Sequence, residues 1–531
     1  MREHYVLSIF YVTIFCALSF VYSKHSLHMF QQQHYELKRY SKWLFNKNNI
    51  HFSPVLVYIA LALIIYFLDY FKVVDNNLLL LFISLFITVL FTIYVVYMEA
   101  KKYYAIDLVL TARVKRQIFV YTILLVAITY AVLILYENYF LTGIVSVYLP
   151  YLLVYLVAII TYPIEELIKK RYENEARQIL DKMDNLIKIG ITGSYGKTST
   201  KNIINDIVSD NYFTLMTPAS FNTPMGITRT IREQLKPIHE VFVCEMGADK
   251  INDISYLMNF IKPKFGVVTS IGPQHLSTFG TIGNIVYEKM KEIELLPSDG
   301  IGIINVDNEL IANYQIKNNC KIIRVGIDNQ NADYVAKNIK YTSEGSSFSV
   351  KIGNKSYKFN TLLLGKNNIT NILIGIAAAV ELNIDIKDIV KKVSGIKQIS
   401  HRLEVKRMNN MTFIDDAFNS NPVGSKMAID VLQNMNGKKI VITPGMIDLG
   451  KIQDKTNEEF GEYMADKVDY VLLVAEKQTK PIYNGLVKSG FDSNKIKVFE
   501  NTKDAINYAY ANFTSDDTIL IENDLPDAFN V

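Results

Sequence analysis

Hydrophobic residues are distributed very unevenly along the chain. Up to about residue 162 the sequence is mostly Leu, Ile, Val, Phe and Tyr, whereas beyond Lys169 it has the mixed pattern of a water-soluble enzyme. Five apolar runs in the first part are long enough, or nearly so, to cross about 30 Å of hydrocarbon as helices. They lie at about 5–23, 52–71, 77–98, 117–136 and 140–163. The pattern predicts an α-helical membrane region over 1–180.

Basic residues flank these runs asymmetrically. Lys and Arg gather after the first, third and fifth runs, within 24–47, 101–116 and 169–171. The positive-inside rule places these segments in the cytoplasm and the N-terminus outside. We therefore expect a multi-pass protein of the plasma membrane, in contact with membrane lipids, whose remaining domains are cytoplasmic. A cleaved signal peptide is the alternative interpretation of the first run.

A buried strand at 187–191 runs directly into a glycine-containing turn and then into a segment with helical spacing. This order is the context of a P-loop, in which backbone N–H groups and a helix N-terminus hold phosphate, a lysine neutralises it and a hydroxyl holds Mg²⁺. An ordinary glycine turn beside an exposed lysine is the alternative. The residues of the predicted nucleotide-binding turn are Gly193, Ser194, Tyr195, Gly196, Lys197, Thr198 and Ser199.

Charge and cysteine content narrow the classes of function. The net charge is only +4 and the basic residues form no continuous stripe, so we expect no nucleic-acid partner. The three cysteines are far apart, which fits neither a disulfide framework nor a metal knuckle. A reducing compartment for the soluble domains follows from this pattern.

The P-loop spacing and the motifs after it resemble the Mur ligase family, whose members build the peptidoglycan stem peptide, over about two thirds of the chain. The resemblance implies an α/β P-loop central domain at 181–399 and an α/β Rossmann-like C-terminal domain at 400–531. In the central domain it implies a substrate loop containing Asn222, Mg²⁺ ligation by Thr198, Glu245 and His275, and nucleotide contacts from Asn305 and Asn371. Lys289 matches a lysine that many members carry as a carbamate, although Lys291 or a solvated helix face are alternatives. The motifs are Ser220–Gly226, Glu245-Met246-Gly247, Thr269–Leu276, Asn305–Asn308 and Gly365–Asn371.

The predicted C-terminal domain begins with the Ser-His-Arg-Leu-Glu segment at 400–404, which resembles the arginine-bearing hinge of the family. Arg402 and Asp415 would complete the nucleotide site when that domain closes, unless Asp415 is only a helix-capping carboxylate. The Asp-Asp-x-aromatic-Asn-x-Asn-Pro motif at 415–422 resembles the ligases that add D-alanyl-D-alanine, which implies substrate contacts from Asn419 and Asn421. In soluble members a UDP-sugar domain precedes the P-loop, and here the apolar runs occupy its place.

The resemblance implies an ATP-dependent, ADP-forming amide ligase with two Mg²⁺ ions, in which Lys197, His275 and Lys289 are catalytic. Its substrates would be a cell-wall precursor carboxylate and an amino acid or dipeptide, D-alanyl-D-alanine first among them. A ligase for a lipid-linked precursor or another poly-amino-acid polymer is the second hypothesis. A membrane scaffold switched by nucleotide, without ligase activity, is the third.

Overall fold

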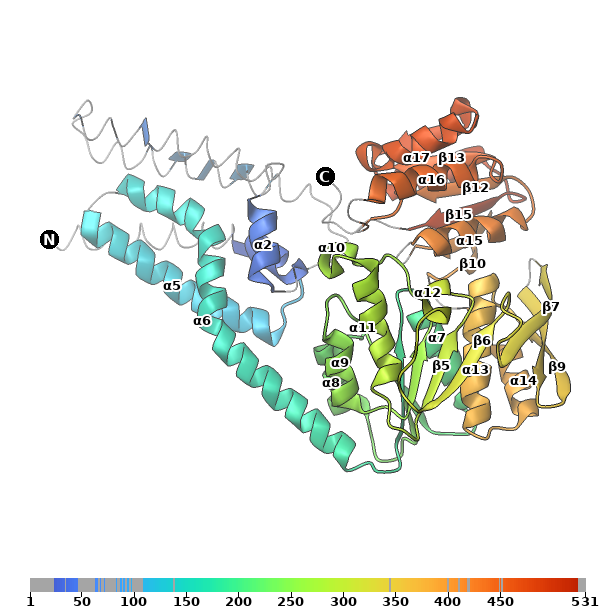
Figure 1. Ribbon diagram of the computed structural model, residues 1–531. Coiled ribbons are helices and arrows are strands. Elements are labelled where there is room, and N and C mark those ends of the chain that lie inside the picture. Colours follow the sequence, from blue (N-terminus) through green and yellow to red (C-terminus); the bar gives the residue numbers. More distant parts are fainter. Residues whose placement is uncertain are drawn as a thin grey trace. The chain divides into compact units, whose positions relative to one another are not determined.

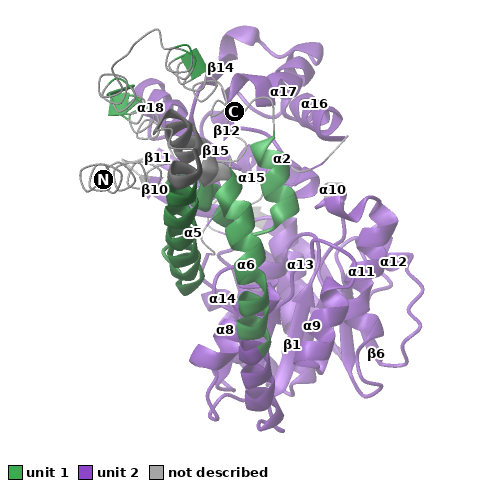
Figure 2. Ribbon diagram, turned by 90° about the vertical axis from the view of Figure 1, so that its left-hand side faces the viewer, with its two compact units in different colours: residues 1–170, 526–531 green, residues 171–525 purple. Residues whose placement is uncertain are grey.

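The computed structural model covers 531 residues, and it describes 23–33, 35–45, scattered positions between 63 and 97, 108–136, 139–342, 345–398, 401–408, 411–417, 421–447, 449 and 452–523. The chain divides into two compact units, one of residues 1–170 with 526–531 and one of residues 171–525 (Figure 2).

In the first unit, three elements pack around a small apolar core. A helical segment at 23–32 and helix α2 (Leu37–Leu44) place Leu27, Phe30 and Tyr40 against α6 (Tyr139–Asp181). Helix α5 (Ala112–Tyr136) packs on the same helix through Tyr121 and Leu125. The basic segment at 24–47, which we expected to be a loop between spans, is therefore helical over most of its described residues.

Helix α5 has large apolar residues on its exposed side and two polar residues among its buried ones. Its large apolar residues Phe119 and Ile123 are exposed, whereas Gln117 and Thr129 are buried. Its stretch Ala112–Ala131, with a mean hydropathy of 1.3, is long and apolar enough to cross a membrane, and only 28% of its 18-residue window is buried. A helix from the core of a soluble protein would be mostly buried instead.

The described residues include most of two of the five predicted spans. The runs at 5–23, 52–71 and 77–98 lie almost wholly outside the described residues. The run at 117–136 falls in α5, and the run at 140–163 forms the first part of the 43-residue helix α6. Within the part of the chain that the structure describes, α5 contains the single candidate span. The five-span arrangement accordingly stays a prediction.

The second unit begins with a largely parallel sheet of nine strands in the order β2-β3-β1-β4-β5-β6-β7-β8-β9, the last three of which pair antiparallel (Figure 1). Because β1 lies between β3 and β4, the chain changes direction across the sheet beside β1, which is where α/β folds bind ligands. The strands are β1 Ile187–Thr192, β2 Thr214–Met216, β3 Val241–Glu245, β4 Phe265–Val268, β5 Ile301–Asn305, β6 Lys321–Gly326, β7 Tyr334–Thr342, β8 Gly345–Ile352 and β9 Lys355–Thr361.

Helices cover both faces of this sheet, since its central strands are apolar on both sides. Side chains of α7, α13 and α14 form one core with Ile189 and Val243, and those of α8, α9 and α11 form the other with Phe242. The helices are α7 Lys197–Val208, α8 Pro224–Gln234, α9 Asp253–Ile261, α10 Leu276–Phe279, α11 Ile282–Glu294, α12 Glu309–Ala312, α13 Lys366–Glu381 and α14 Ile386–Gly395.

The last part of α6 belongs to the core of the second unit. Ala176 and Leu180 are buried in the same core as Phe242. Glu175 accepts a hydrogen bond from Arg232 on α8 at 2.8 Å, and the Arg232 guanidinium lies 3.8 Å from the ring centre of Tyr172. Residues 171–180, which we assigned to the membrane region, thus pack with the sheet domain that follows them.

A second sheet of six strands follows, in the order β10-β11-β15-β12-β13-β14, parallel except for β10. Helices α15, α16 and α17 cover one face and α18 the other, as the apolar positions of β12 require. This confirms an α/β architecture for the C-terminal part. The elements are β10 Glu404–Met408, β11 Met411–Asp416, α15 Pro422–Gln433, β12 Lys439–Thr443, α16 Gln453–Met464, β13 Tyr470–Val474, α17 Glu476–Lys488, the 3₁₀ turn Ser493–Lys495, β14 Ile496–Phe499, α18 Thr502–Asn512 and β15 Thr518–Glu522.

Candidate active site

The turn between β1 and α7 adopts conformations that only glycine tolerates. Gly193 has φ of 149°, and a Cβ there would come within 2.1 Å of the Thr269 hydroxyl, while Gly196 has φ of 83° directly before α7. Ser194 fixes the turn to the next loop, because its hydroxyl donates to the Gly272 carbonyl and accepts from the Gly272 N–H, both at 3.0 Å. The turn therefore places the N-terminal amides of α7 at the carboxyl edge of the sheet, the arrangement that binds phosphate.

A carboxylate from β3 meets the first turn of α7. Glu245 is 1% exposed, and its Oε2 accepts from the Thr198 hydroxyl at 3.0 Å. Its Oε1 accepts from the Asn222 amide at 3.0 Å. The Asn222 loop in turn approaches the strand end so closely that a Cβ on Gly247 would lie 2.8 Å from the Asn222 side chain. Three predicted site residues from separate segments thus converge.

These oxygen atoms suit Mg²⁺. A carboxylate and a hydroxyl beside a phosphate-binding turn are hard ligands, which Mg²⁺ combines with water and substrate phosphates rather than with a full protein cage. Consistent with such an open site, no group of three His, Cys, Asp or Glu side chains in the described ranges could hold a metal by itself. The residues present fit the implied ion.

Lys197 lies at the start of α7 and points back over the turn. Its Nζ donates to the carbonyls of Gly193 at 2.7 Å and Ser194 at 3.1 Å. Desolvation in this half-buried position lowers the pKa of Lys197 to about 8, although Glu245 opposes the shift and Arg402 adds to it. A phosphate at the turn would restore the charged form, because an adjacent anion favours the ammonium.

A second group of charges lies on the other side of Lys197. His275 Nε2 is 3.4 Å from Asp249 Oδ1. Lys289 on α11 is 2% exposed, and burial, reinforced by the nearby Lys197, lowers its pKa to about 7. Lys291 instead lies with its Nζ 4.5 Å from the Tyr287 ring centre, which distinguishes the two lysines: only Lys289 is directed into the protein.

Asn305 and Asn371 support the loops of the site in this structure. The Asn305 amide donates to the Thr269 carbonyl at 3.0 Å, which joins the ends of β5 and β4. Asn371 on α13 accepts from the Thr200 hydroxyl of α7 at 3.0 Å, next to Gly196. Their predicted contacts with nucleotide remain predictions.

The predicted hinge arginine lies among carboxylates of both sheet domains. Burial lowers the pKa of Arg402, while Asp416, Glu245 and Glu522 oppose the shift. Burial also raises the pKa of Asp416 to about 6 against the influence of Arg402. Arg402 therefore lies near Glu245 of the central domain as well as near the end of β11.

Asp415 and the two asparagines of its motif have separate environments. The Asp415 carboxylate accepts from Lys406 at 2.6 Å and lies 2.9 Å from His401 Nδ1, and these partners outweigh burial and lower its pKa. The Asn421 side chain caps α15 by accepting from Gly424 N–H at 2.9 Å. Asn419 lies outside the described residues.

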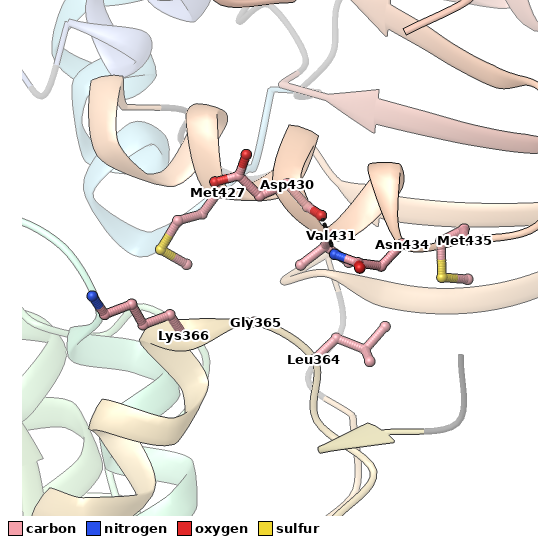
Figure 3. A pocket seen from close by; sticks show the side chains of 8 residues that line it. All are labelled: Leu364, Gly365, Lys366, Met427, Asp430, Val431, Asn434 and Met435. Carbon is pink, nitrogen blue, oxygen red and sulfur yellow. Dashed lines mark hydrogen bonds between the residues drawn. The ribbon is translucent and has the colours of Figure 1, made fainter. Parts of the chain in front are cut away.

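A pocket of about 230 Å³ lies between the turn that starts α13 and helix α15 (Figure 3). It contains none of the predicted site residues, and its charged residues already have partners: Lys366 pairs with Asp328 and Asp430 pairs with Lys467 at 2.9 Å. We therefore place the chemistry at the phosphate-binding turn. The lining residues are Leu364, Gly365, Lys366, Met427, Asp430, Val431, Asn434 and Met435.

Two residues at the site were not found by sequence reasoning. Lys201 is 1% exposed, and its Nζ lies 3.2 Å from Glu245 Oε2 and also contacts the Ala219 carbonyl. Asp249 follows β3 and faces His275. The sequence contains a signal for each residue. Lys201 lies one helical turn after Lys197, on the same side of the predicted helix, and Asp249 lies four residues after Glu245.

Both sheet domains are similar to known proteins. Residues 191–379 match the family model of the Mur ligase middle domain, and 401–522 match that of the Mur ligase glutamate ligase domain. Over 339 residues the chain is 30% identical to UDP-N-acetylmuramoyl-tripeptide–D-alanyl-D-alanine ligase of Bacillus subtilis, covering 63% of this chain and 72% of that protein. The Escherichia coli protein of the same name is 28% identical over 292 residues, covering 54% and 64%. MurF ligase from Thermotoga maritima in complex with ADP has a TM-score of 0.61 at 22% identity, covering 68% of this chain and 81% of that chain.

Proposed function

Because the chain belongs to the Mur ligase family of ATP-dependent, ADP-forming amide ligases, we propose that it joins D-alanyl-D-alanine to the peptide carboxylate of a cell-wall precursor. The observation that carries the proposal is the convergence of Thr198, Asn222 and Glu245 beside the phosphate-binding turn. The choice of dipeptide follows the Bacillus subtilis relative and the Asp-Asp-x-aromatic-Asn-x-Asn-Pro motif.

The reaction proceeds in two substitutions. A carboxylate oxygen of the precursor attacks the γ-phosphorus of ATP, the bond to the β,γ-bridging oxygen breaks, and ADP leaves. The amine of the incoming substrate then attacks the acyl carbon, the bond to phosphate breaks, and the amine gives up a proton. Lys197 and the amides of α7 stabilise the charge on the transferring group, which is the main task of the protein in phosphoryl transfer.

Thr198 and Glu245 would hold Mg²⁺, and His275 with Asp249 lies where a second ion would bind. Bound Mg²⁺ neutralises phosphate charge and orients the oxygens in line. Lys289 is the residue for carbamylation, in which its neutral amine attacks CO₂, an N–C bond forms and a proton passes to solvent. Arg402 and Asp415 contact the nucleotide when the C-terminal domain closes, which excludes water from the acyl phosphate.

The first unit would hold the enzyme at the plasma membrane, with five spans and with the two sheet domains in the cytoplasm. The exposed apolar surface and buried polar residues of α5 support this location. Lipid is the environment in which such a distribution is stable, because apolar side chains face hydrocarbon and polar ones face protein.

A second candidate function is ligation to a lipid-linked precursor or to another poly-amino-acid polymer. The distribution of apolar and polar residues on α5, which supports a membrane location, also favours this function. The two family models match residues 191–379 and 401–522, both after the first unit. An acceptor confined to the bilayer would be concentrated near the enzyme. This higher local concentration compensates for a low affinity of the acceptor site. The nucleotide-switched scaffold is disfavoured, because the parts for phosphoryl transfer are assembled.

The test is a ligation assay on the full chain in detergent with ATP and Mg²⁺, in which product mass is measured. The acceptors are a soluble UDP-linked muramoyl tripeptide and a lipid-linked form, and the amines are D-alanyl-D-alanine, D-alanine and glutamate. We expect a product only with D-alanyl-D-alanine. A product with another amine alone would contradict the proposed substrate, and the absence of any product would contradict the proposed function.

A further inference from the structure

Two polar side chains near the start of α5, one helical turn apart, have buried atoms without hydrogen-bond partners. Gln117 is 1% exposed, and neither its amide nitrogen nor its amide oxygen is bonded. The Nε of Arg113 is buried and also lacks an acceptor. Leaving such groups unpaired is unfavourable, so buried polar groups in native proteins nearly always have partners.

The surroundings hold these two side chains in place. The Arg113 guanidinium lies 4.0 Å from the ring centre of Tyr35. The Gln31 side chain donates to the Val109 carbonyl at 2.9 Å and accepts from its N–H at 3.0 Å, which joins the 23–33 segment to the start of α5. Arg113 therefore lies against the segment that precedes α2, and that segment is bonded to the start of α5.

Arg113 is the basic residue of this region whose Nε has no hydrogen-bond acceptor. Glu165 on α6 is held by Arg116, whose Nε and second terminal nitrogen donate to its two oxygens at 2.8 and 2.7 Å. Glu165 and Glu166 lie within electrostatic range of Arg113, and Lys115 beside it is exposed. Arg116 thus occupies both oxygens of Glu165, and the Nε of Arg113 is left without an acceptor.

The unsatisfied atoms define what they can bind. An arginine N–H and an amide NH₂ require acceptor oxygens, and the amide oxygen requires a donor such as a hydroxyl. A phosphate ester attached to a sugar offers both, and its charge suits the Arg113 guanidinium. Gln117 is the first residue of the apolar run at 117–136, so in a membrane-spanning helix it would lie near the boundary between hydrocarbon and lipid headgroups.

We propose that Arg113 and Gln117 form a binding site for the phosphate and sugar of a lipid-linked precursor. The inference rests on the proposed membrane location and names the acceptor of the proposed ligase. It assigns to the first unit the recognition of the acceptor headgroup in addition to anchoring.

The experiment uses the full chain in phosphatidylcholine nanodiscs, titrated with a polyprenyl pyrophosphate that carries a sugar and followed by the fluorescence of Trp43. Trp43 is the one tryptophan of the chain and packs beside Tyr40 in the same unit. We expect Gln117→Leu to weaken binding about tenfold or more, since 1.4 kcal/mol is a factor of ten. Its thermal midpoint should not fall, because leucine removes an unsatisfied amide from the interior.

Thr129→Val is the matched control. Thr129 is buried on the same helix, its hydroxyl also lacks a partner, and it lies three turns further along. Its substitution should leave binding unchanged. Equal affinity of wild type and Gln117→Leu, or an equal loss in Thr129→Val, would overturn the site.

The origin of the phosphate is tested by competition with inorganic pyrophosphate. We expect it to compete only weakly, and competition at the same concentration as the lipid would overturn the assignment to a lipid-linked ligand. The two proposals fail separately. A wild-type protein that binds the lipid but ligates nothing contradicts the proposed function, whereas ligation with unchanged lipid binding in Gln117→Leu contradicts this inference.

Discussion

Lys201 and Glu245 form a buried ion pair beneath the phosphate-binding turn, with 3.2 Å between Nζ and Oε2 and each side chain 1% exposed. The pair joins α7 to the end of β3, across 44 residues of sequence. Because Glu245 also accepts from Thr198 and Asn222, the lysine fixes the carboxylate and supplies its counter-charge. A buried carboxylate that lost this partner would be strongly unfavourable.

Lys201→Met should therefore destabilise the protein by about 3–5 kcal/mol, the cost of breaking a buried ion pair. Mg²⁺ with ADP should raise the thermal midpoint of Lys201→Met more than that of wild type, because the cation replaces the missing charge at Glu245. Circular dichroism melts with and without ligand measure both effects. Lys201→Arg should restore most of the difference.

An exposed ion pair provides the control for Lys201. Lys321 pairs with Glu381 at 2.8 Å while remaining largely exposed, so Lys321→Met should cost no more than about 1 kcal/mol. If Lys201→Met and Lys321→Met melt alike, or if ligand shifts Lys201→Met and wild type equally, Lys201 has no role at the cation site.

Lys197→Ala should abolish ATP-dependent ligation, with a loss of at least about 100-fold in kcat/KM, the range for removal of one stabilising group. The thermal midpoint should change little, because Lys197 is desolvated and bonds only to backbone carbonyls. Ligation kinetics and melts on the same preparations test this. Lys355→Ala changes an exposed lysine of β9 and should behave as wild type. Retention of more than a few per cent of wild-type turnover in Lys197→Ala would exclude the P-loop role of Lys197.

Glu245→Gln should raise the Mg²⁺ concentration for half-maximal activity about tenfold or more, because an amide oxygen binds Mg²⁺ less strongly than a carboxylate. Chelation should abolish ligation by wild type, and added Mg²⁺ should restore it. Glu233→Gln, in the exposed Arg229–Glu233 pair, is the control. Magnesium titrations that overlay for Glu245→Gln and wild type would remove Glu245 from the metal site.

Much of this site could be predicted from local sequence because its residues follow strands. Glu245 ends an uninterrupted apolar strand, and Lys197 follows a glycine turn, so parallel pairing brings both to one edge of the sheet. The partnership of Lys201 with Glu245 depends on how α7 is rotated about its axis, which local spacing does not fix. The helical character of 24–47 was missed because we took its basic residues as a sign of a loop.

Glu292 should make stability depend on pH. It is fully buried, both carboxyl oxygens lack partners, and burial raises its pKa to about 8 against the influence of Lys289. Between about pH 4.5 and 8 the unfolded chain releases this proton and the folded chain keeps it, so stability falls as pH rises through that window. Glu292→Gln, which imitates the neutral form, should flatten the dependence and melt higher than wild type at pH 8. Thermal midpoints of wild type and Glu292→Gln are measured at pH 5 and pH 8. An identical fall of the midpoint in both proteins would show that Glu292 is not the source of the pH dependence.

The topology of the first unit follows from charge and can be tested residue by residue. The positive-inside rule predicts that the basic segments at 24–47, 101–116 and 169–171 are cytoplasmic, with Lys47, Lys102 and Lys170 inside and the N-terminus outside. ATP is also inside, so the sheet domains that follow residue 171 must be there for the enzyme to work. Single cysteines replacing each lysine should react with a membrane-impermeant maleimide only after the cells are permeabilised.

Asn138→Cys, between the fourth and fifth predicted spans, should react in intact cells and so provides the matched control. Cys16 is first replaced by serine, and Cys244 and Cys320 are buried and should contribute little background. Labelling of Lys170→Cys in intact cells would contradict the whole arrangement, since it would place the nucleotide site away from its nucleotide. Protection of Asn138→Cys together with Lys170→Cys would instead mean that α5 and the following run do not cross the bilayer as a pair, and that the first unit is held at the cytoplasmic surface.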